Sequence, residues 1–357
     1  MVGKTRGPAL VTMGGCGRKV GQADLSSALK AVDNEVVPGR PNQSVGTFYD
    51  SGDVGTVLLS EEHRGFATST DLVYPVCEDA EEFGYIAAVH SLSDLYAALA
   101  TPLWATLAVG VTRRDVEHGL LGPIMQGVRS GIADNGGTMV GGHSAYSAET
   151  FAVVSVTGLL ESRPIVKVTT GDIVVLSKPL GVGIALAAQR MGLINSTDSY
   201  LEIQSMRRSN RDAAQSLQAM RQRYPEAIKS VTDVSGFGLL AGLRSAAVGY
   251  RVMIDSTHVP SFPRTLELIR LGAASPLGDG NMLAAERSVL FEVPPSGLDE
   301  IRVLLNDPQT SGGLLAVVTP EAFRDLQNFE SATWVAIGEI GGPGSVVGDS
   351  TPPIAVV

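Results

Sequence analysis

Apolar residues recur with helix-like and strand-like spacing along the first half of the chain. Residues 81–100 predict a long helix, with Asp79 as its N-cap and acidic residues in its first turn. A second helix is expected from about Asp115 to the Asn-Gly-Gly stop at 135–137, and Pro123 inside it predicts a kink or a later start. Segments rich in Val, Ile, Thr and aromatic residues predict strands at 54–59, 65–70, 104–110 and 151–159.

The first long helix carries apolar residues on two sides, a pattern typical of a helix buried between two layers. Leu92 and Leu95 share one face, Phe83 lies on another, and His90 and Asp94 stand one turn apart among the apolar positions. A buried carboxylate needs a hydrogen-bond partner or a metal ion. Asp94 is therefore either a metal ligand or a residue paired with His90 or with the backbone.

The second half of the chain alternates strand patterns with helix patterns. Strands are predicted at 173–177, 251–254, 288–293, 314–318 and 335–340. Helices are predicted at 183–191, 238–247, 264–271, 298–306 and 320–329, and the charged helical stretch 195–229 is expected on the surface. The fold class that follows is α/β and α+β in two domains. We place a flexible glycine-rich segment at 1–40, an N-terminal α/β domain at 41–163 and a C-terminal α+β domain at 164–357.

Composition narrows the classes of function. A chain of 357 residues exceeds the roughly 250–300 residues at which a single core stops growing, which supports two domains. The net charge of −10, without clustered Lys and Arg, argues against nucleic acid as a partner. No apolar run approaches the ~18 residues that span a bilayer, so we expect no membrane partner. The two cysteines, Cys16 and Cys77, form no CxxC or zinc pattern, which favours a reducing, cytoplasmic location.

Two positions in the first half could carry chemistry. Cys16 lies among glycines beside Arg18 and Lys19, and nearby positive charge favours the reactive thiolate. An exposed cysteine without a function is the alternative. Asp71 closes a predicted strand, where it either holds a metal ion or a substrate hydroxyl or caps the following turn.

Three glycine-containing segments are further candidates. Gly141-Gly142-His143-Ser144 follows a short strand-like stretch and forms either a phosphate-binding loop or an ordinary turn. Asp233 precedes the glycine-rich start of a helix, which makes it part of an anion or metal site or simply of a capped helix. The segment 307–313, Asp-Pro-Gln-Thr-Ser-Gly-Gly, is chemically unusual, but its residue types alone indicate no role.

Separated carboxylates, a nucleophile, a lysine and a glycine–hydroxyl segment are the groups that metal-assisted phosphoryl transfer uses. The chain has no G-x-x-x-x-G-K-[ST] sequence, which excludes a P-loop enzyme. It also has no G-x-G-x-x-G at a strand–helix junction, which argues against a Rossmann cofactor site.

The order of these segments resembles the selenide, water dikinase (selenophosphate synthetase) family, within the aminoimidazole ribonucleotide synthetase superfamily. The resemblance extends from Gly14 to about Ile340. Its motifs are Gly-Cys-Gly-x-Lys at 15–19, Leu-Ser-Asp at 92–94, Gly-Gly-His-Ser at 141–144, Lys-Pro-Leu-Gly-x-Gly at 178–183, Thr-Asp-Val-Ser-Gly-Phe-Gly-Leu-Leu at 232–240 and Asp-Pro-Gln-Thr-Ser-Gly-Gly-Leu-Leu at 307–315.

The resemblance implies an enzyme that converts ATP, selenide and water to selenophosphate, AMP and orthophosphate with Mg²⁺. It implies Cys16 and Lys19 as catalytic residues, and it implies Asp53, Asp94 and Asp233 as magnesium ligands. The residues that it implies at the nucleotide are Lys19, Ser51, Gly52, Asp53, Asp71, Asp94, Gly142, His143 and Ser144. It also implies a homodimer in which the N-terminal domains pair into a β-barrel, with 142–144 contributed across the dimer.

The chain departs from the family pattern at two positions. The family's paired aspartates correspond here to Asp53 and Val54, so one metal-binding carboxylate is missing, and His90 replaces an asparagine. Three hypotheses remain: an active selenide, water dikinase, a sister ATP-dependent enzyme that acts on another nucleophile, and a non-catalytic nucleotide-binding homologue. Selenide-dependent AMP formation distinguishes the first hypothesis from the other two.

Overall fold

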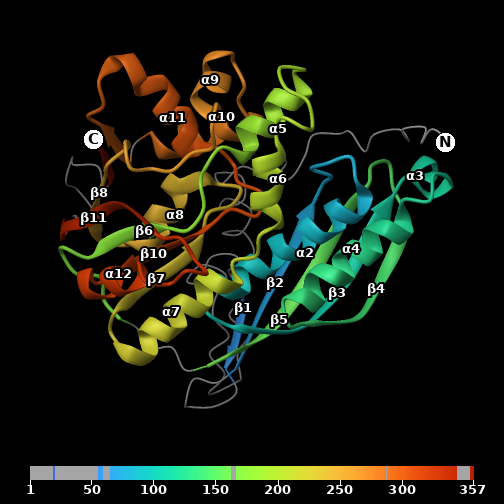
Figure 1. The fold of residues 1–357 in the computed structure, drawn as a ribbon, viewed down its shortest axis with the longest axis horizontal. Coiled ribbons are helices and arrows are strands. Elements are labelled where there is room, and N and C mark those ends of the chain that lie inside the picture. Colours follow the sequence, from blue (N-terminus) through green and yellow to red (C-terminus); the bar gives the residue numbers. More distant parts are fainter. Residues whose placement is uncertain (1–18, 21–54, 59–64, 162–165, 287, 344–353) are drawn as a thin grey trace, which may run out of the picture.

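The structure, a computed structural model, describes residues 19–20, 55–58, 65–161, 166–286, 288–343 and 354–357. Within these residues the chain forms two sheets, each with its own helices, which confirms the predicted combination of α/β and α+β folds (Figure 1). The predictions on Cys16 and on 51–53 lie outside the described residues. None of the described helices is both long enough and apolar enough to cross a membrane.

The N-terminal sheet has five strands in the order β1-β2-β5-β3-β4, and β3 and β4 form its parallel pair. The strands are β1 (Gly55–Leu58), β2 (Gly65–Val73), β3 (Thr101–Val111), β4 (Thr138–Tyr146) and β5 (Phe151–Leu160). Four of them confirm predicted strands with shifted ends. Strand β2 continues past Asp71 to Val73, so Asp71 lies inside the strand and does not close it.

The loop expected at 141–144 was a wrong prediction, because strand β4 continues through these residues to Tyr146. The parallel pairing with β3 extends from Trp104 opposite Thr138 to Val111 opposite Tyr146, and it keeps residues 141–144 in strand conformation. At Gly142 a Cβ atom would lie 2.1 Å from the carbonyl oxygen of Leu107, so glycine is required there by the close approach of β3.

Helices α2 (Ala80–Ala97), α3 (Arg113–Glu117) and α4 (Leu121–Asp134) belong to this half. Asp79 caps α2 as predicted, since its Oδ1 accepts a hydrogen bond from the Glu82 N–H at 2.9 Å. The second predicted helix divides into α3 and α4, and Pro123 falls in the first turn of α4, where proline is tolerated. Gly136 follows α4 with a φ of +84°, a backbone conformation that suits glycine.

The C-terminal sheet has seven strands in the order β7-β10-β6-β11-β8-β12-β9. Its strands are β6 (Ile173–Leu176), β7 (Ile228–Asp233), β8 (Tyr250–Ile254), β9 (Val289–Phe291), β10 (Leu314–Val318), β11 (Val335–Pro343) and β12 (Ile354–Val356). The helices of this half are α5 (Val182–Arg190), α6 (Tyr200–Arg207), α7 (Arg211–Arg223), α8 (Gly238–Ala246), α9 (Thr265–Arg270), α10 (Pro276–Ala285), α11 (Leu298–Asn306) and α12 (Pro320–Leu326), with a 3₁₀ turn at Pro295–Gly297.

Sequence patterns missed β7, α10 and β12, and the surface assignment of 195–229 was only partly right. Helix α7 is amphipathic, and its Leu217 and Met220 are buried although its outer face is charged. Strand β7 begins at the end of this charged stretch, and its pairing with β10 makes it a strand.

Helix α2 lies where the two halves of the chain meet (Figure 1). It contacts β2 and β5 of its own sheet, and it also contacts α6, β7 and β10 of the C-terminal half. This double contact confirms the prediction of a helix buried on two sides and explains why the polar residues His90, Ser93 and Asp94 are buried with the apolar ones.

Candidate active site

Asp94 is held at the contact between α2 and β2. Only 5% of the residue is exposed, and its Oδ2 accepts a hydrogen bond from the Ser69 hydroxyl at 2.5 Å. Hydrogen bonds of this length between a hydroxyl and a carboxylate are strong. Ser69 and Asp71 stand two apart on β2, so strand periodicity directs both side chains toward α2.

Asp71 lies beside His90, which is one turn before Asp94 on the same helix. The Nε2 atom of His90 is 3.9 Å from Asp71 Oδ1, and its Nδ1 faces the Ser311 N–H at 3.1 Å. Because a backbone N–H can only donate, Nδ1 accepts and the proton of a neutral imidazole resides on Nε2, toward Asp71. His90 thus connects Asp71 to the segment 307–313 of the other half.

Asp233 ends strand β7 and comes to the same helix from the C-terminal half. Its Oδ2 accepts a hydrogen bond from the Ser93 hydroxyl at 2.9 Å. Lys19 also reaches this region, since its Nζ lies 5.6 Å from the ring centroid of Phe237, four residues after Asp233. One turn of α2 therefore brings Asp71, Asp94 and Asp233 together, with Lys19 at the segment that follows Asp233.

The segment 307–313 has a structural role that its residue types did not indicate. Asp307 and Gln309 cap helix α5 from outside it: Gly183 N–H donates to Asp307 Oδ2 at 3.0 Å, and the N–H groups of Gly181 and Val182 donate to Gln309 Oε1 at 3.2 Å. Burial raises the pKa of Asp307 to about 8.

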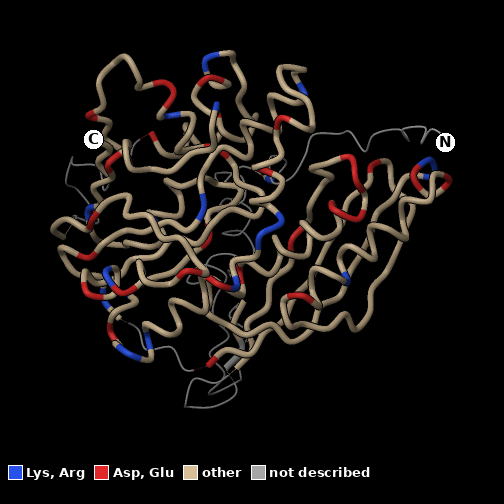
Figure 2. Tube along the Cα trace, viewed as in Figure 1, with Lys and Arg blue, Asp and Glu red and all other residues tan. Residues whose placement is uncertain are grey.

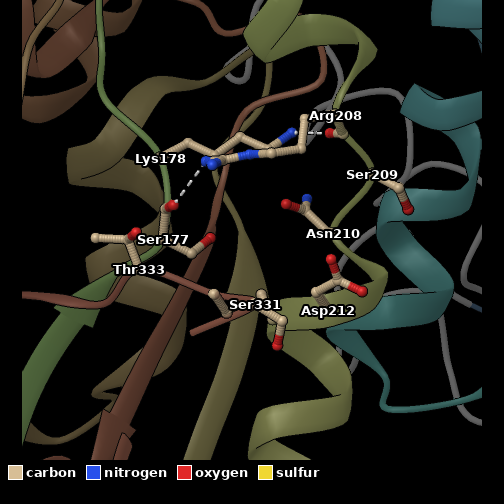
Figure 3. A pocket seen from close by; sticks show the side chains of 10 residues that line it. Ser177, Lys178, Arg208, Ser209, Asn210, Asp212, Ser331 and Thr333 are labelled. Atoms are coloured by element: carbon tan, nitrogen blue, oxygen red, sulfur yellow. Dashed lines mark hydrogen bonds between the residues drawn. The ribbon is translucent and has the colours of Figure 1, made fainter. Parts of the chain in front are cut away.

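Lys178 fixes the other end of this segment. Its ammonium group is buried and donates to three backbone carbonyls, those of Ser205, Arg208 and Ser311. Burial first, and the adjacent Arg208 guanidinium second, lower the pKa of Lys178. Figure 3 shows Lys178 and Arg208 on the wall of a polar cavity that Asn210 also lines. Ser311 has a φ of +52°, and its N–H and carbonyl are bound by His90 and Lys178 respectively.

Gly142, His143 and Ser144 do not join this cluster within the chain. They lie exposed on β4, and two strands, β5 and β3, separate β4 from the strand that carries Asp71. With neighbouring strands about 4.8 Å apart, this arrangement places them at least roughly 14 Å away. The structure thus links Asp71, Asp94 and Asp233 to one turn of α2, places Lys19 against Phe237, and leaves 142–144 at the edge of the sheet.

The carboxylates offer the donor chemistry that a magnesium ion requires. Carboxylate and hydroxyl oxygens are the ligands that Mg²⁺ prefers, and Asp94 and Asp233 are linked through Ser93, so the donor chemistry fits. Within the described ranges, no group of three or more His, Cys, Asp or Glu side chains is arranged to hold an ion. The expected third ligand, Asp53, lies outside those ranges.

Sequence reasoning missed Ser69, Ser93 and Asn210 as partners of the acids. The period-2 spacing of Ser69 and Asp71 could have indicated Ser69, whereas the contacts of Asn210 depend on residues far away in the sequence. Cys77 has no role at the site: it is half-buried, its thiol donates to the Asp79 carbonyl, and burial raises its pKa to about 12. A thiol with so high a pKa is a poor nucleophile.

Comparison with known proteins agrees with this organisation. The family model for the N-terminal domain of AIR synthase related proteins matches residues 52–160, and the model for their C-terminal domain matches residues 169–349. Among solved structures, thiamine monophosphate kinase from Aquifex aeolicus is 15% identical with a TM-score of 0.60, covering 94% of this chain and 96% of its own. The HypE–HypF complex gives a TM-score of 0.62 at 17% identity, covering 94% of this chain and 97% of its own. At these identities the likeness concerns the fold.

Curated relatives are closer in sequence. Selenide, water dikinase of Desulfitobacterium hafniense is 36% identical over 346 residues, which cover 92% of this chain and 94% of that protein. Selenide, water dikinase of an Escherichia coli strain is 30% identical over 337 residues, which cover 92% and 91% of the two chains. Because the likeness extends over nine-tenths of both proteins and includes both domains, the chain belongs to the selenide, water dikinase family of phosphotransferases.

Proposed function

We propose that this protein synthesises selenophosphate from ATP, selenide and water in the cytoplasm, with release of AMP and orthophosphate. The observation that carries the proposal is the meeting of Asp71, Asp94 and Asp233 at one turn of α2, with Lys19 beside the segment that follows Asp233. Relatives named selenide, water dikinase at 30–36% identity support the choice of selenide as substrate.

ATP is the proposed nucleotide. The structure of AaThiL complexed with AMPPCP and TMP matches 93% of this chain with a TM-score of 0.62 at 18% identity. A protein of related fold therefore binds an ATP analogue. We assign Lys19, Asp71 and Asp94 to nucleotide contacts, together with Ser51, Gly52 and Asp53 from the preceding segment. The ammonium group of lysine acts as a compact positive charge that stabilises phosphate oxygens, and this suits the position of Lys19.

We assign Mg²⁺ to Asp53, Asp94 and Asp233. When bound, the ion neutralises phosphate oxygens and thereby favours displacement at phosphorus. Ser69 and Ser93 donate to two of these acids and keep their oxygens in place before the ion and ATP arrive. The two acids come from different halves of the chain, so the packing of α2 against β7 sets the distance between them.

Cys16 is the proposed nucleophilic residue. Arg18 and Lys19 follow it, and their charge favours its thiolate. The contrast with Cys77 supports this assignment, because the burial of Cys77 raises its pKa and disfavours its thiolate.

A homodimer is the proposed assembly, and pairing of the N-terminal sheets into a barrel is its proposed form. Helices cover one face of the five-stranded sheet, whereas Trp104 and Leu159 present apolar surface on the other face and every residue but one of β4 is exposed. A second copy on this face would bury that surface and would bring Gly142, His143 and Ser144 toward the partner's nucleotide.

The proposal is tested by analysing the products formed from ATP under anaerobic conditions with Mg²⁺, with and without selenide. The wild type should form AMP and orthophosphate only when selenide is present. Cys16→Ala should form neither, and Cys77→Ala should behave as the wild type because Cys77 is removed from the site.

Two other results would reject the proposal. ATP turnover that is independent of selenide would favour a sister enzyme acting on another nucleophile. ATP binding without turnover would favour a nucleotide-binding homologue, and the specific observation behind that alternative is Val54 in place of a family aspartate.

A further inference from the structure

A chain of buried hydrogen bonds joins the two halves of the protein at Asp233. Asn210 Nδ2 donates to the Gly312 carbonyl and to Ser93 Oγ, both at 2.9 Å, and Ser93 Oγ donates to Asp233 Oδ2 at 2.9 Å. Ser93 belongs to α2 of the N-terminal half, whereas the other three residues of this hydrogen-bond chain belong to the C-terminal half.

The direction of each bond is determined by its partners. The Gly312 carbonyl can only accept, so the Asn210 amide must present its nitrogen, and this nitrogen carries two protons. One proton goes to Gly312 and the other to Ser93. Ser93 Oγ then accepts from Asn210, which leaves its single proton for Asp233. The Asn210 amide thereby orients the Ser93 hydroxyl toward the Asp233 carboxylate.

Burial makes this arrangement rigid. Ser93 and Asn210 are 1% and 2% exposed, so water does not compete for their hydrogen bonds. The Oδ1 atom of Asn210 is buried and has no partner among the described residues, and the residue lines the polar cavity between Arg208 and Asp212 (Figure 3). An unpaired buried oxygen is unfavourable. The two hydrogen bonds that the Asn210 amide nitrogen donates therefore explain why an asparagine occupies this position.

Ser93 also precedes Asp94 directly. Consecutive residues of one helix thus serve the two acids: Ser93 holds Asp233 across the domain contact, and Asp94 supplies its own carboxylate. A shift of Ser93 would change the position of Asp233 relative to Asp94, and the spacing of two acidic ligands controls the affinity for an ion between them.

We propose that Ser93 and Asn210 are positioning residues that hold the Asp233 carboxylate at the place where, with Asp94, it binds a divalent cation. The inference rests on the proposed function only in assigning Asp94 and Asp233 to the ion. Asn210 acts through Ser93, and neither residue touches the substrate.

The test measures binding of Mn²⁺, as a paramagnetic substitute for Mg²⁺, by electron paramagnetic resonance in the presence of a non-hydrolysable ATP analogue and without selenide. Ser93→Ala and Asn210→Ala should each raise the Kd for Mn²⁺ about 10-fold or more, the range found when residues that orient metal ligands are removed. The double variant should bind no more weakly than Ser93→Ala, because Asn210 acts through Ser93. Ser93→Cys, whose thiol is a weak donor, should fall between the wild type and Ser93→Ala.

The matched control is Ser91→Ala. Ser91 is buried on the same helix, but its hydroxyl donates to the Ala87 carbonyl of that helix and does not reach the acids. Its Kd for Mn²⁺ should equal that of the wild type. Circular dichroism and thermal unfolding identify variants that fail to fold, and Asn210→Ala then carries the test if Ser93→Ala does fail.

Several results would overturn the inference. One is an unchanged Kd for Mn²⁺ in folded Ser93→Ala and Asn210→Ala, and another is an equal loss in Ser91→Ala. Additive losses in the double variant would show that Asn210 acts independently of Ser93. A wild type that binds no ion would also reject the inference, whereas a wild type that binds Mn²⁺ with the expected variant pattern but makes no selenophosphate would reject only the proposed function.

Discussion

Asp307 should make the stability of this protein depend on pH in a direction opposite to that of most acids. The residue is buried, and its Oδ2 accepts hydrogen bonds from Gly183 N–H at 3.0 Å and from Gln309 Nε2 at 2.7 Å. Its Oδ1 is buried without a partner among the described residues. Desolvation therefore dominates, and it raises the pKa of Asp307 to about 8.

The sign follows from proton binding in the two states. An unfolded aspartic acid has a pKa of about 3.9, so between about pH 4 and pH 8 the folded state holds a proton that the unfolded state has lost. The contribution of Asp307 to stability is fully present below pH 4 and is lost as the pH rises through 8. The slope approaches about 1.4 kcal/mol per pH unit, so the stability lost over the whole interval is on the order of several kcal/mol.

Asp307→Asn removes the titrating proton while keeping an oxygen that can accept from Gly183. Its free energy of unfolding, minus that of the wild type, should therefore increase with pH by about 1.4 kcal/mol per unit between about pH 5 and pH 8. Urea unfolding followed by both circular dichroism and fluorescence would measure this difference, since coincident transitions are needed for a two-state value. The loss of a carboxylic acid band in the infrared difference spectrum at pH 7 would assign the proton to Asp307.

A difference in unfolding free energy that stays constant from pH 5 to pH 8 would refute this reasoning, because it would mean that Asp307 is ionised in the folded state. If the capping hydrogen bonds outweighed desolvation, the difference would likewise stay constant over this range and would change only below about pH 4.

Two further predictions concern packing and assembly. Gly127→Ala should lower the unfolding free energy by about 1–3 kcal/mol or more, because the added Cβ would lie 1.9 Å from the Glu81 carbonyl oxygen of α2. Gly122, on the same helix, faces open space, so Gly122→Ala should raise the unfolding free energy by about 0.5–1 kcal/mol. Equal effects of the two changes on thermal unfolding would contradict the close contact of α2 and α4. Trp104→Glu on the open face of the N-terminal sheet should convert a dimeric mass in light scattering to a monomeric one, and Leu283→Glu, at an exposed position of α10, should leave the mass unchanged. A monomeric wild type would refute the proposed dimer.

Local signals in the sequence predicted much of the fold. The cap at Asp79, the proline in the first turn of α4 and the bounds of α11 and β10 depend on neighbouring residues, and the structure confirms each of them. The extension of β4 through 141–144 depends instead on β3, more than thirty residues away, and glycines that look like a turn serve there to let two strands approach. Strand β7 similarly exists through its pairing with β10.

The residues of the candidate site also fall into those that local motifs indicate and those that depend on contacts with distant parts of the chain. The acids at 71, 94 and 233 could be chosen from motifs, and the structure brings them to one helix. The residues that orient them could not be chosen so, since Ser93 contacts Asp233 and Asn210 across separations of 140 and 117 residues. The role of 307–313 as a cap for α5 likewise requires two segments that are distant in sequence. Charge distribution gave no guide to these contacts, because the N-terminal half carries mainly Asp and Glu whereas the C-terminal half carries charges of both signs (Figure 2).

Because Val54 replaces a family aspartate, the proposed cation site should depend more strongly on the position of α2. A site with fewer carboxylates has less charge with which to hold a cation, so its affinity depends more on the placement of the acids that remain. Two of these, Asp94 and Asp233, come from different halves and are related through Ser93 of α2. His90, one turn earlier on α2, binds the segment 307–313 through Ser311, and Lys178 binds the same residue from the opposite side. Any change that moves α2 relative to β7 must therefore alter the spacing of Asp94 and Asp233 together with the contacts of this segment. Mutations at the domain contact should thus reduce affinity for the proposed cation even where they lie far from the acids.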